Sequence, residues 1–497
     1  MHGHDGTSRG GARRCPSGRT VREIGVRPDE PPAFLGGPDR PSRPSSCRRT
    51  SPREKAASSV PTMTTQPHWS VRLTELAARH RVPGAALGIL YDGLVSEAAT
   101  GWANADARIE ATTDTVWQIG SITKVWTATV VLCLAEAGLL DLDAPVVSVL
   151  PELRLADAEL TQTITPRHLL SHTGGIDGDL FTDTGRGDDC LERYVALLAD
   201  ARVTFPLGAT MSYCNAGYSL AGRMIEKVTG LVWDEAMREH LYEPLGLTHT
   251  SALPEDVLRF RAAIGHIGEH AAPRWGLPRS AGPAGTICST AKDLLVFAAL
   301  HLEGFEEMRE EQVRMPDPHT HGDAWGLGWA LFDWGGRLVA GHDGGTVGQS
   351  SFLRVLPDAG LAVCLLTNGG DADALYRDLF EEIFAELAGV LMPEPPCPAE
   401  DPPGFDLAPY TGVYARDSAR ITITPQDDGL MFHAAPVNAD AALIARPAVE
   451  FQLHPVRPGL FVLRPDGVRD WSSVTFYTLP DGSAYLHRGL RATPKVG

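Results

Sequence analysis

Three features are missing from this sequence: a membrane-length apolar run, a paired cysteine pattern and an excess of positive charge. The apolar segment 127–140 has the length of one core helix and contains Glu136, so no transmembrane helix is expected. The eight cysteines are scattered without a C-x-x-C spacing, which fits neither a zinc site nor a dense disulfide framework. The formal net charge of -18 would repel nucleic acid and anionic membranes, so we expect neither as a partner.

The sequence does contain enough apolar material for a large folded protein. With 497 residues and 43% hydrophobic content, the chain can bury a core and form more than one domain. Residues 1–62 differ from the rest, because they carry 12 Lys and Arg against 6 Asp and Glu and lack the apolar segment of an export signal. We expect a disordered extension and a cytoplasmic protein, and we consider Met63 as an alternative start.

The clearest indication of chemistry is Gly120-Ser121-Ile-Thr-Lys124, which lies between the strand-like residues 114–119 and the apolar run 125–138. A helix that begins near Ser121 places Ser121 and Lys124 one turn apart on one face. A lysine whose pKa is lowered by burial can take the serine proton, and the helix start offers the serine N–H to an oxyanion. This predicts a nucleophile, Ser121, and its general base, Lys124.

The same S-x-x-K spacing recurs from Ser289 to Lys292, so the spacing alone is weak evidence. We expect no strand ahead of this copy, and Ser289 or Thr290 is typical of an N-cap for a helix over 291–302. We interpret the second copy as helix capping.

A polar segment, Tyr213-Cys-Asn215, stands before an apolar helix expected over 219–228 and is the only Y-x-N in the chain. Tyr213 is suited to relay a proton, and the Asn215 amide is suited to hold a substrate carbonyl while contacting Lys124. The alternative is that both residues only cap the helix.

A glycine-rich segment, His342-Asp-Gly344-Gly345, lies between two expected strands. Glycines let the backbone approach a substrate, so the N–H of Gly345 is a candidate second oxyanion donor, with His342 polarising the site or meeting a carboxylate. The same H-x-G spacing also starts at His172, but there we expect a structural imidazole, with its hydrogen bonds satisfied, in a helix C-terminal turn.

The remaining pattern predicts an α+β chain with a separate β region. Residues 85–102 are expected to form a hairpin, residues 190–305 are largely helical, and strands return over 326–367. Short strands at regular spacing near the C-terminus are typical of a small antiparallel barrel or sandwich. The expected segments are the extension 1–62, a catalytic domain 63–392, a Pro-rich linker 393–405 and a β domain 406–497.

Taken in order, the S-x-x-K, Y-x-N and H-x-G motifs resemble those of the serine β-lactamase and penicillin-binding-protein superfamily. The match is closest to its class C-like branch of D-alanyl-D-alanine carboxypeptidases, D-amino-acid peptidases and esterases. It covers residues 70–390 and implies a β-lactamase/transpeptidase-like fold, an antiparallel sheet flanked by helices with a helical subdomain. The segment that opens at Tyr410 resembles a lipocalin-like domain, which implies a small all-β barrel.

The resemblance also implies a role for each motif. Ser121 would be acylated, Lys124 would be its base, Tyr213 a proton relay and Asn215 a substrate-orienting amide, and the N–H groups of Ser121 and Gly345 would form the oxyanion hole. His342 and Gly344 would line the substrate site. The chain departs from true β-lactamases at His342, where they carry the lysine of K-T-G, so the permanent cation for a β-lactam carboxylate is missing.

These observations predict a serine hydrolase that acts through an acyl-enzyme on small-molecule or peptide esters or amides, including D-amino-acid or β-lactam-related substrates. No cofactor and no metal are expected, because His319 and His321 lack a third ligand. The alternatives are an acyl transferase or peptide cyclase, which some relatives with an added β-domain suggest, a D-alanyl-D-alanine carboxypeptidase, and a non-catalytic binding module. The sequence leaves the oligomeric state open.

Overall fold

The computed structural model describes residues 67–318, 321–400, 404–426, 429–437 and 448–497. The expected extension, residues 1–62, therefore lies outside the described residues, as does His319. The described residues belong to one compact unit of the chain.

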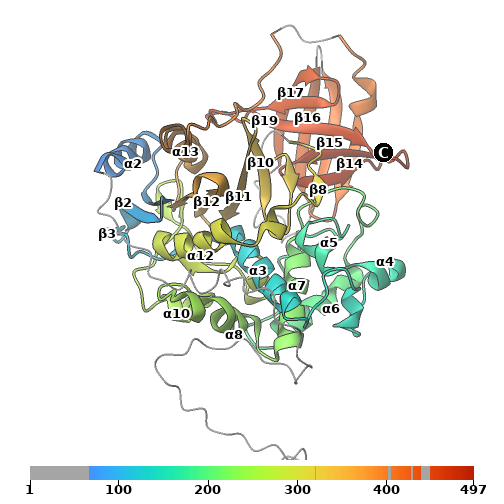
Figure 1. Cartoon of the computed structure of the whole chain (residues 1–497). Coiled ribbons are helices and arrows are strands. Elements are labelled where there is room, and N and C mark those ends of the chain that lie inside the picture. Colours follow the sequence, from blue (N-terminus) through green and yellow to red (C-terminus); the bar gives the residue numbers. More distant parts are fainter. Residues whose placement is uncertain (1–66, 319–320, 401–403, 427–428, 438–447) are drawn as a thin grey trace, which may run out of the picture. The chain divides into compact units, whose positions relative to one another are not determined.

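A nine-stranded antiparallel sheet, in the order β3-β2-β1-β13-β12-β11-β10-β9-β8, forms the centre of the larger, N-terminal part of the described chain (Figure 1). Its long strands are rich in buried apolar residues, because helices cover both faces. β1 pairs with β13, so the first and last strands of this part in sequence lie side by side in the sheet. The strands are β1 Gly84–Tyr91, β2 Leu94–Asn104, β3 Ile109–Glu110, β8 Val313–Arg314, β9 Ala324–Trp325, β10 Ala330–Trp334, β11 Arg337–Gly345, β12 Ser350–Leu356 and β13 Leu361–Thr367.

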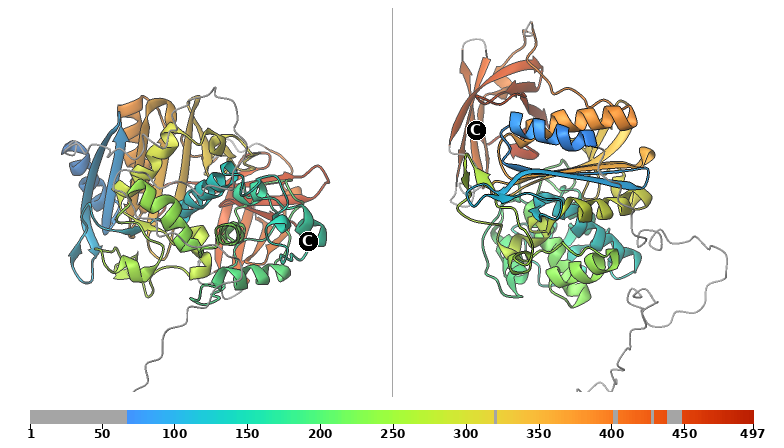
Figure 2. Two further views of the ribbon diagram at one scale, coloured as in Figure 1. Left: turned by 60° about the horizontal axis from the view of Figure 1, so that its bottom comes forward. Right: turned by 90° about the vertical axis from the view of Figure 1, so that its left-hand side faces the viewer.

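Helices α2 (Pro67–Arg79) and α13 (Ala372–Ala388) cover one face of this sheet, and α12 (Ala291–Glu303) covers the other (Figure 2). The side chains divide accordingly into two cores, one under α2 and α13 and a larger one that includes α12 and α3 (Thr123–Glu136). α3 is buried on nearly all sides, which explains its continuous apolar sequence.

The helical subdomain extends the larger core away from the sheet. Its helices are α4 Ala158–Thr163, α5 Pro166–Leu170, α6 Cys190–Leu197, α7 Asn215–Thr229, α8 Trp233–Met237, α9 Glu243–Leu245, α10 Pro254–Val257 and α11 Gly282–Gly285. Two small sheets pair β4 Trp117–Gln118 with β7 Cys288–Ser289, and β5 His266–Ile267 with β6 His270–Ala271.

The C-terminal part is an eight-stranded antiparallel sheet that curls into a nearly closed barrel (Figure 1). Its first strand meets the segment that follows its last strand, where Val413 N–H donates to the Gly497 carbonyl at 2.7 Å. Buried aromatic and aliphatic side chains, including Phe432, Phe461 and Phe476, fill its interior. The strands are β14 Gly412–Arg416, β15 Ala419–Gln426, β16 Gly429–Pro436, β17 Val449–Arg457, β18 Leu460–Leu463, β19 Ser472–Thr478, β20 Ala484–Arg488 and β21 Arg491–Pro494.

The predicted fold class is confirmed, but four local predictions are wrong. The strand ahead of Ser121 is only the two residues of β4, and α7 begins at Asn215 rather than Ser219, because Cys214 and not a later residue is its N-cap. The H-x-G motif lies inside β11 rather than beyond a strand end, since β11 stays paired with β12 as far as Gly345. A short strand, β7, does precede the second S-x-x-K copy.

None of the described helices has both the length and the apolar character that crossing a membrane requires. The six cysteines within the described residues are all free thiols, and only Cys397 is exposed.

Candidate active site

Ser121 lies in a single turn of 3-10 helix, Gly120–Ile122, between β4 and α3. The turn packs against β11 so closely that a Cβ on Gly120 would meet the Gly345 nitrogen at 2.7 Å. Gly120 also has a positive φ of +50°, a conformation that glycine adopts without strain. The glycine thus lets the Gly345 backbone lie beside the turn that carries Ser121, as the oxyanion prediction requires.

Close packing next to the Ser121 turn also explains why position 344 is a glycine. A Cβ there would meet the Ile119 carbonyl oxygen at 2.0 Å, and the Ser351 hydroxyl donates to that same oxygen at 2.7 Å. Strands β11 and β12 therefore fix the backbone that leads into Ser121.

Replacing Gly120 with alanine is expected to lower stability by roughly 3 kcal/mol, since it adds positive-φ strain to a backbone clash. It should also reduce activity more than tenfold by displacing Ser121 from Gly345. Gly138→Ala is the matched control, because Gly138 has φ +70° but nothing within 4 Å of its added Cβ. We expect that control to cost roughly 1 kcal/mol in urea unfolding and to keep its activity. Equal losses in the two variants would contradict the close packing.

Lys124 is fully buried on the first turn of α3, with its Nζ 3.1 Å from Ser121 Oγ. The Nζ also donates to the Ala284 carbonyl at 2.6 Å, which fixes the side chain. Burial lowers the pKa of Lys124 well below its usual value, and the nearby positive charge of Arg491 adds to this. A neutral amine beside the serine hydroxyl has the chemistry of a general base.

Tyr213 is buried beside the same pair, with Lys124 Nζ 4.7 Å from the centre of its ring. Burial raises the pKa of Tyr213 above its usual value, although the Ser121 hydroxyl and the Arg491 guanidinium oppose this rise. Tyr213 is therefore a neutral phenol at neutral pH, suited to pass on a proton rather than to act as a phenolate base.

His342 is buried on β11, with its Nε2 3.5 Å from the Tyr213 hydroxyl. Its Nδ1 lies 2.8 Å from the Asp343 carbonyl oxygen, which can only accept, so Nδ1 carries the proton and Nε2 is an acceptor. Burial and the nearby Lys124 lower the pKa of His342 to about 3. The ring is thus neutral and does not replace the missing lysine cation.

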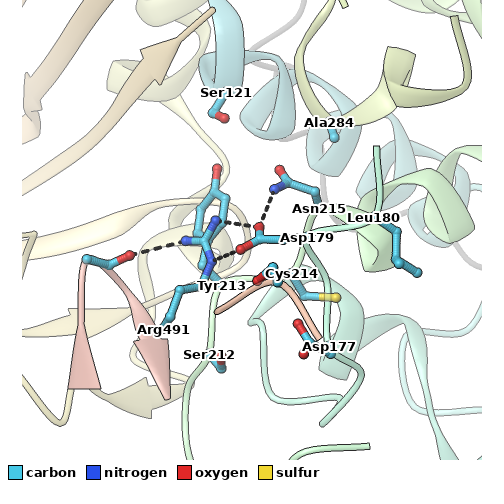
Figure 3. Close-up of polar contacts among 12 residues, drawn as sticks. Ser121, Asp177, Asp179, Leu180, Ser212, Tyr213, Cys214, Asn215, Ala284 and Arg491 are labelled. Carbon is cyan, nitrogen blue, oxygen red and sulfur yellow. Dashed lines mark hydrogen bonds and ion pairs between the residues drawn. The ribbon is translucent and has the colours of Figure 1, made fainter. Parts of the chain in front are cut away.

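Asn215 is the first residue of α7, and its Nδ2 donates to Asp179 Oδ1 at 3.2 Å (Figure 3). No hydrogen bond joins Asn215 to Lys124 in the part of the chain that the structure describes. Asp179 holds only the amide nitrogen, so a contact between the amide oxygen and Lys124 stays a prediction.

Only one of the two ring nitrogens of His172 has the expected hydrogen bond. Its Nδ1 accepts from the Cys214 N–H at 3.0 Å, but its Nε2 is buried without a hydrogen-bond partner among the described residues. The ring packs on Tyr213 with centroids 4.3 Å apart, so it supports the Y-x-N segment through contact rather than through two hydrogen bonds.

Three residues at the site were not predicted from the sequence: Asp179, Arg416 and Arg491. Asp179 follows the Gly174-Gly175 turn, and both arginines come from the barrel, at β14 and β21. The Arg491 guanidinium pairs with Asp179 at 2.7 Å and lies 4.8 Å from the Tyr213 ring centre. An acidic D-x-D at 177–179 is visible in the sequence, but nothing there links it to the barrel.

The second S-x-x-K copy is a helix cap, as predicted. Thr290 is the N-cap of α12, and its hydroxyl accepts from Asp293 N–H at 3.1 Å. Lys292 is exposed and Ser289 is fully buried, so the two side chains do not form a reactive pair. Among the described residues, no group of three or more His, Cys, Asp or Glu side chains is arranged to hold a metal ion.

Comparisons with known proteins show which proteins the chain is similar to. The family model described as Beta-lactamase matches residues 71–387. Penicillin-binding protein 4 of Amycolatopsis lactamdurans is 45% identical over 371 residues, which make up 70% of this chain and 97% of that protein.

Two solved structures match at different levels. The structure of SurE with D-Leu has a TM-score of 0.69 at 28% identity and covers 86% of this chain and 99% of that chain. Because this share is larger than residues 71–387 make up, the match includes part of the barrel. A class C beta lactamase from Rhodobacter sphaeroides has a TM-score of 0.55 at 23% identity, covers 64% of this chain and 100% of that chain, and shares the fold.

Proposed function

The chain belongs to the beta-lactamase family, and we propose that it is a serine hydrolase that cleaves esters or amides through an acyl-enzyme on Ser121. One observation carries the proposal: a fully buried lysine, Lys124, with its Nζ 3.1 Å from the Ser121 hydroxyl oxygen. Burying an amine without a charged partner is costly, so its place beside a half-buried serine favours a catalytic role over a structural one.

The proposed reaction has two halves. Lys124 takes the proton of Ser121 as the oxygen attacks the substrate carbonyl, and the N–H groups of Ser121 and Gly345 receive the oxyanion. Lys124 then returns this proton through the Tyr213 hydroxyl to the leaving group, which departs as alcohol or amine and leaves Lys124 neutral again. In the second half, water attacks the acyl-enzyme and gives up a proton to Lys124, and Lys124 passes that proton to Ser121 Oγ as the acid is released.

The charges at the site favour a leaving group without a carboxylate. Burial lowers the pKa of Lys124 well below its usual value and that of His342 to about 3, and Arg491 is paired with Asp179. Apart from Lys124, whose amine the proposed mechanism uses as the base, no cation close to Ser121 is left unpaired among the described residues to hold the carboxylate of a β-lactam or of a D-alanyl-D-alanine peptide. We propose esters and amides of amino acids as the substrate class, with a neutral leaving group.

The acyl part is proposed to be a D-amino acid. The D-Leu in the SurE structure, to which this chain is 28% identical, supports this choice.

A panel of chromogenic substrates tests the proposal. We expect turnover of p-nitrophenyl esters of N-acetyl-D-alanine in preference to the L-enantiomer, and slow or no turnover of a chromogenic cephalosporin. Release of D-alanine from a D-alanyl-D-alanine peptide without any ester turnover would overturn the choice of substrate and favour the carboxypeptidase alternative.

Acyl transfer to an amine is a second candidate, because a barrel turn packs against Tyr213. The Leu490 carbonyl accepts from Tyr213 N–H at 2.8 Å, and Leu490 packs into the apolar cluster around Tyr213. Apolar packing beside the proton relay favours a bound nucleophile over water. In the ester assay with added D-alaninamide, a dipeptide product that exceeds free acid would favour the transferase, and free acid alone would exclude it.

A further inference from the structure

A buried carboxylate, Asp179, joins the barrel to the Y-x-N motif (Figure 3). Its Oδ1 accepts from Asn215 Nδ2 at 3.2 Å and from Arg491 Nη2 at 2.7 Å. Its Oδ2 accepts from Arg491 Nε at 3.0 Å and from Arg416 Nη1 at 2.6 Å. Both oxygens of the carboxylate therefore accept hydrogen bonds. The donors are the two arginines of the barrel, on β14 and β21, and the amide at the start of α7.

The loop that carries Asp179 is fixed against the same motif. The Gly178 carbonyl accepts from Ala216 N–H at 3.1 Å, and a Cβ on Gly178 would meet Cys214 Cα at 2.4 Å. Asp177 N–H donates to the Arg202 carbonyl at 2.8 Å on the other side of the loop. Asp179 thus reaches Asn215 from a backbone that has little freedom to move.

Asp179 is ionised at neutral pH. Burial alone would raise the pKa of its carboxyl, but the facing guanidinium groups of Arg491 and Arg416 outweigh burial and hold that pKa well below its usual range. An ionised carboxylate only accepts hydrogen bonds, so the Asn215 amide must turn its nitrogen toward Asp179. In Figure 3 the amide oxygen accordingly points away from Asp179.

We propose that Asp179, held by Arg491 and Arg416, is a positioning residue that fixes Asn215 as a hydrogen-bond acceptor for an N–H group of the acyl donor. The acyl donors that fit are N-acylaminoacyl or peptidyl groups rather than simple fatty or hydroxy-acid groups. This inference rests on the proposed function, and it adds an acceptor role for the Asn215 amide oxygen to the predicted role of Asn215 as a donor to a substrate carbonyl.

The test uses two p-nitrophenyl esters that differ only at the recognised atom, N-acetyl-D-alanyl and O-acetyl-D-lactyl. The full-length wild-type enzyme should prefer the N–H ester in kcat/KM by about tenfold, the effect of one hydrogen bond. Asp179→Asn should bring this ratio close to one, because a neutral amide partner lets Asn215 adopt either orientation.

Asp177→Asn is the matched control. Asp177 lies on the same loop and contacts the barrel through Asp417 N–H at 2.6 Å and, more distantly, Arg416 Nη1 at 3.9 Å, but it does not bond to Asn215 or Arg491. This variant should keep the tenfold ratio. A merely structural role for Asp179 would lower the rates with both esters equally and leave their ratio unchanged, which would overturn the proposal, as would a wild-type ratio of one.

A binding measurement separates this inference from the proposed function. Calorimetry on Ser121→Ala should show N-acetyl-D-alaninamide binding about tenfold more tightly than O-acetyl-D-lactamide, and Ser121→Ala/Asp179→Asn should lose the difference. If the wild type turns over neither ester, the proposed function fails, and the binding ratio alone then supports or overturns the role of Asp179.

Discussion

Ser121→Ala is expected to lower kcat/KM for the preferred ester by roughly 10⁴-fold or more, because no acyl-enzyme can form without the hydroxyl. Intact-protein mass after exposure to a fluorophosphonate provides a direct measurement. The wild type should gain one adduct, and Ser121→Ala should gain none.

The chain offers its own control for this experiment in the second S-x-x-K copy. Ser289 is fully buried and its hydroxyl lies 2.8 Å from the Thr250 hydroxyl, so Ser289→Ala should still be labelled at Ser121 and keep its turnover. Labelling that survives in Ser121→Ala would move the nucleophile to another serine. An unlabelled wild type would favour the non-catalytic binding module.

Lys124→Met is expected to reduce kcat by about 10³-fold, since general base catalysis typically contributes 10²- to 10⁴-fold. Only the neutral amine accepts a proton, so wild-type activity should increase as the pH rises through the lowered pKa of Lys124. At a pH below that pKa, activity should be low. Lys124→Met should lose this ascending limb. Lys124→Arg should be inactive over the whole range, because arginine stays charged.

Stability separates a catalytic lysine from a structural one. Below its usual pKa the unfolded chain binds a proton that the buried Lys124 does not, so the free energy of unfolding contributed by this residue increases as the pH rises toward that value. Removing the amine should therefore leave the urea midpoint at pH 7 unchanged or higher while activity is lost. Lys292→Met, at an exposed position, should change neither. An ascending limb that persists in Lys124→Met would assign the titration to another group.

The short-range geometry of the site could be predicted from the sequence. Ser121 and Lys124 lie within one turn, so their proximity follows from helix periodicity once a helix is expected there. The strands of the sheet and of the barrel could be predicted too, because strands are also marked by local patterns, here apolar runs and regularly spaced turns. The roles of the motif residues stay predictions.

The long-range geometry could not be predicted. Asp179 and Arg491 are 312 residues apart, and their pairing depends on how the barrel docks, which no local pattern encodes. The carboxylate of Asp179, which holds the Asn215 amide nitrogen, could not be predicted either, because it comes from a separate loop. The neutral state of His342 likewise depends on burial against Lys124 and not on its own segment.

The carboxylate that Arg416 and Arg491 share has a consequence for engineering by domain exchange. A chimera whose barrel comes from a relative that has neither of the two arginines would leave Asp179 of the recipient buried without an ion-pair partner. The grafted barrel would have to include the two arginines, or Asp179 of the recipient would have to be replaced by a neutral residue. The two proteins for a barrel exchange are therefore best chosen by the charges at positions 179, 416 and 491, before sequence similarity across the rest of the barrel.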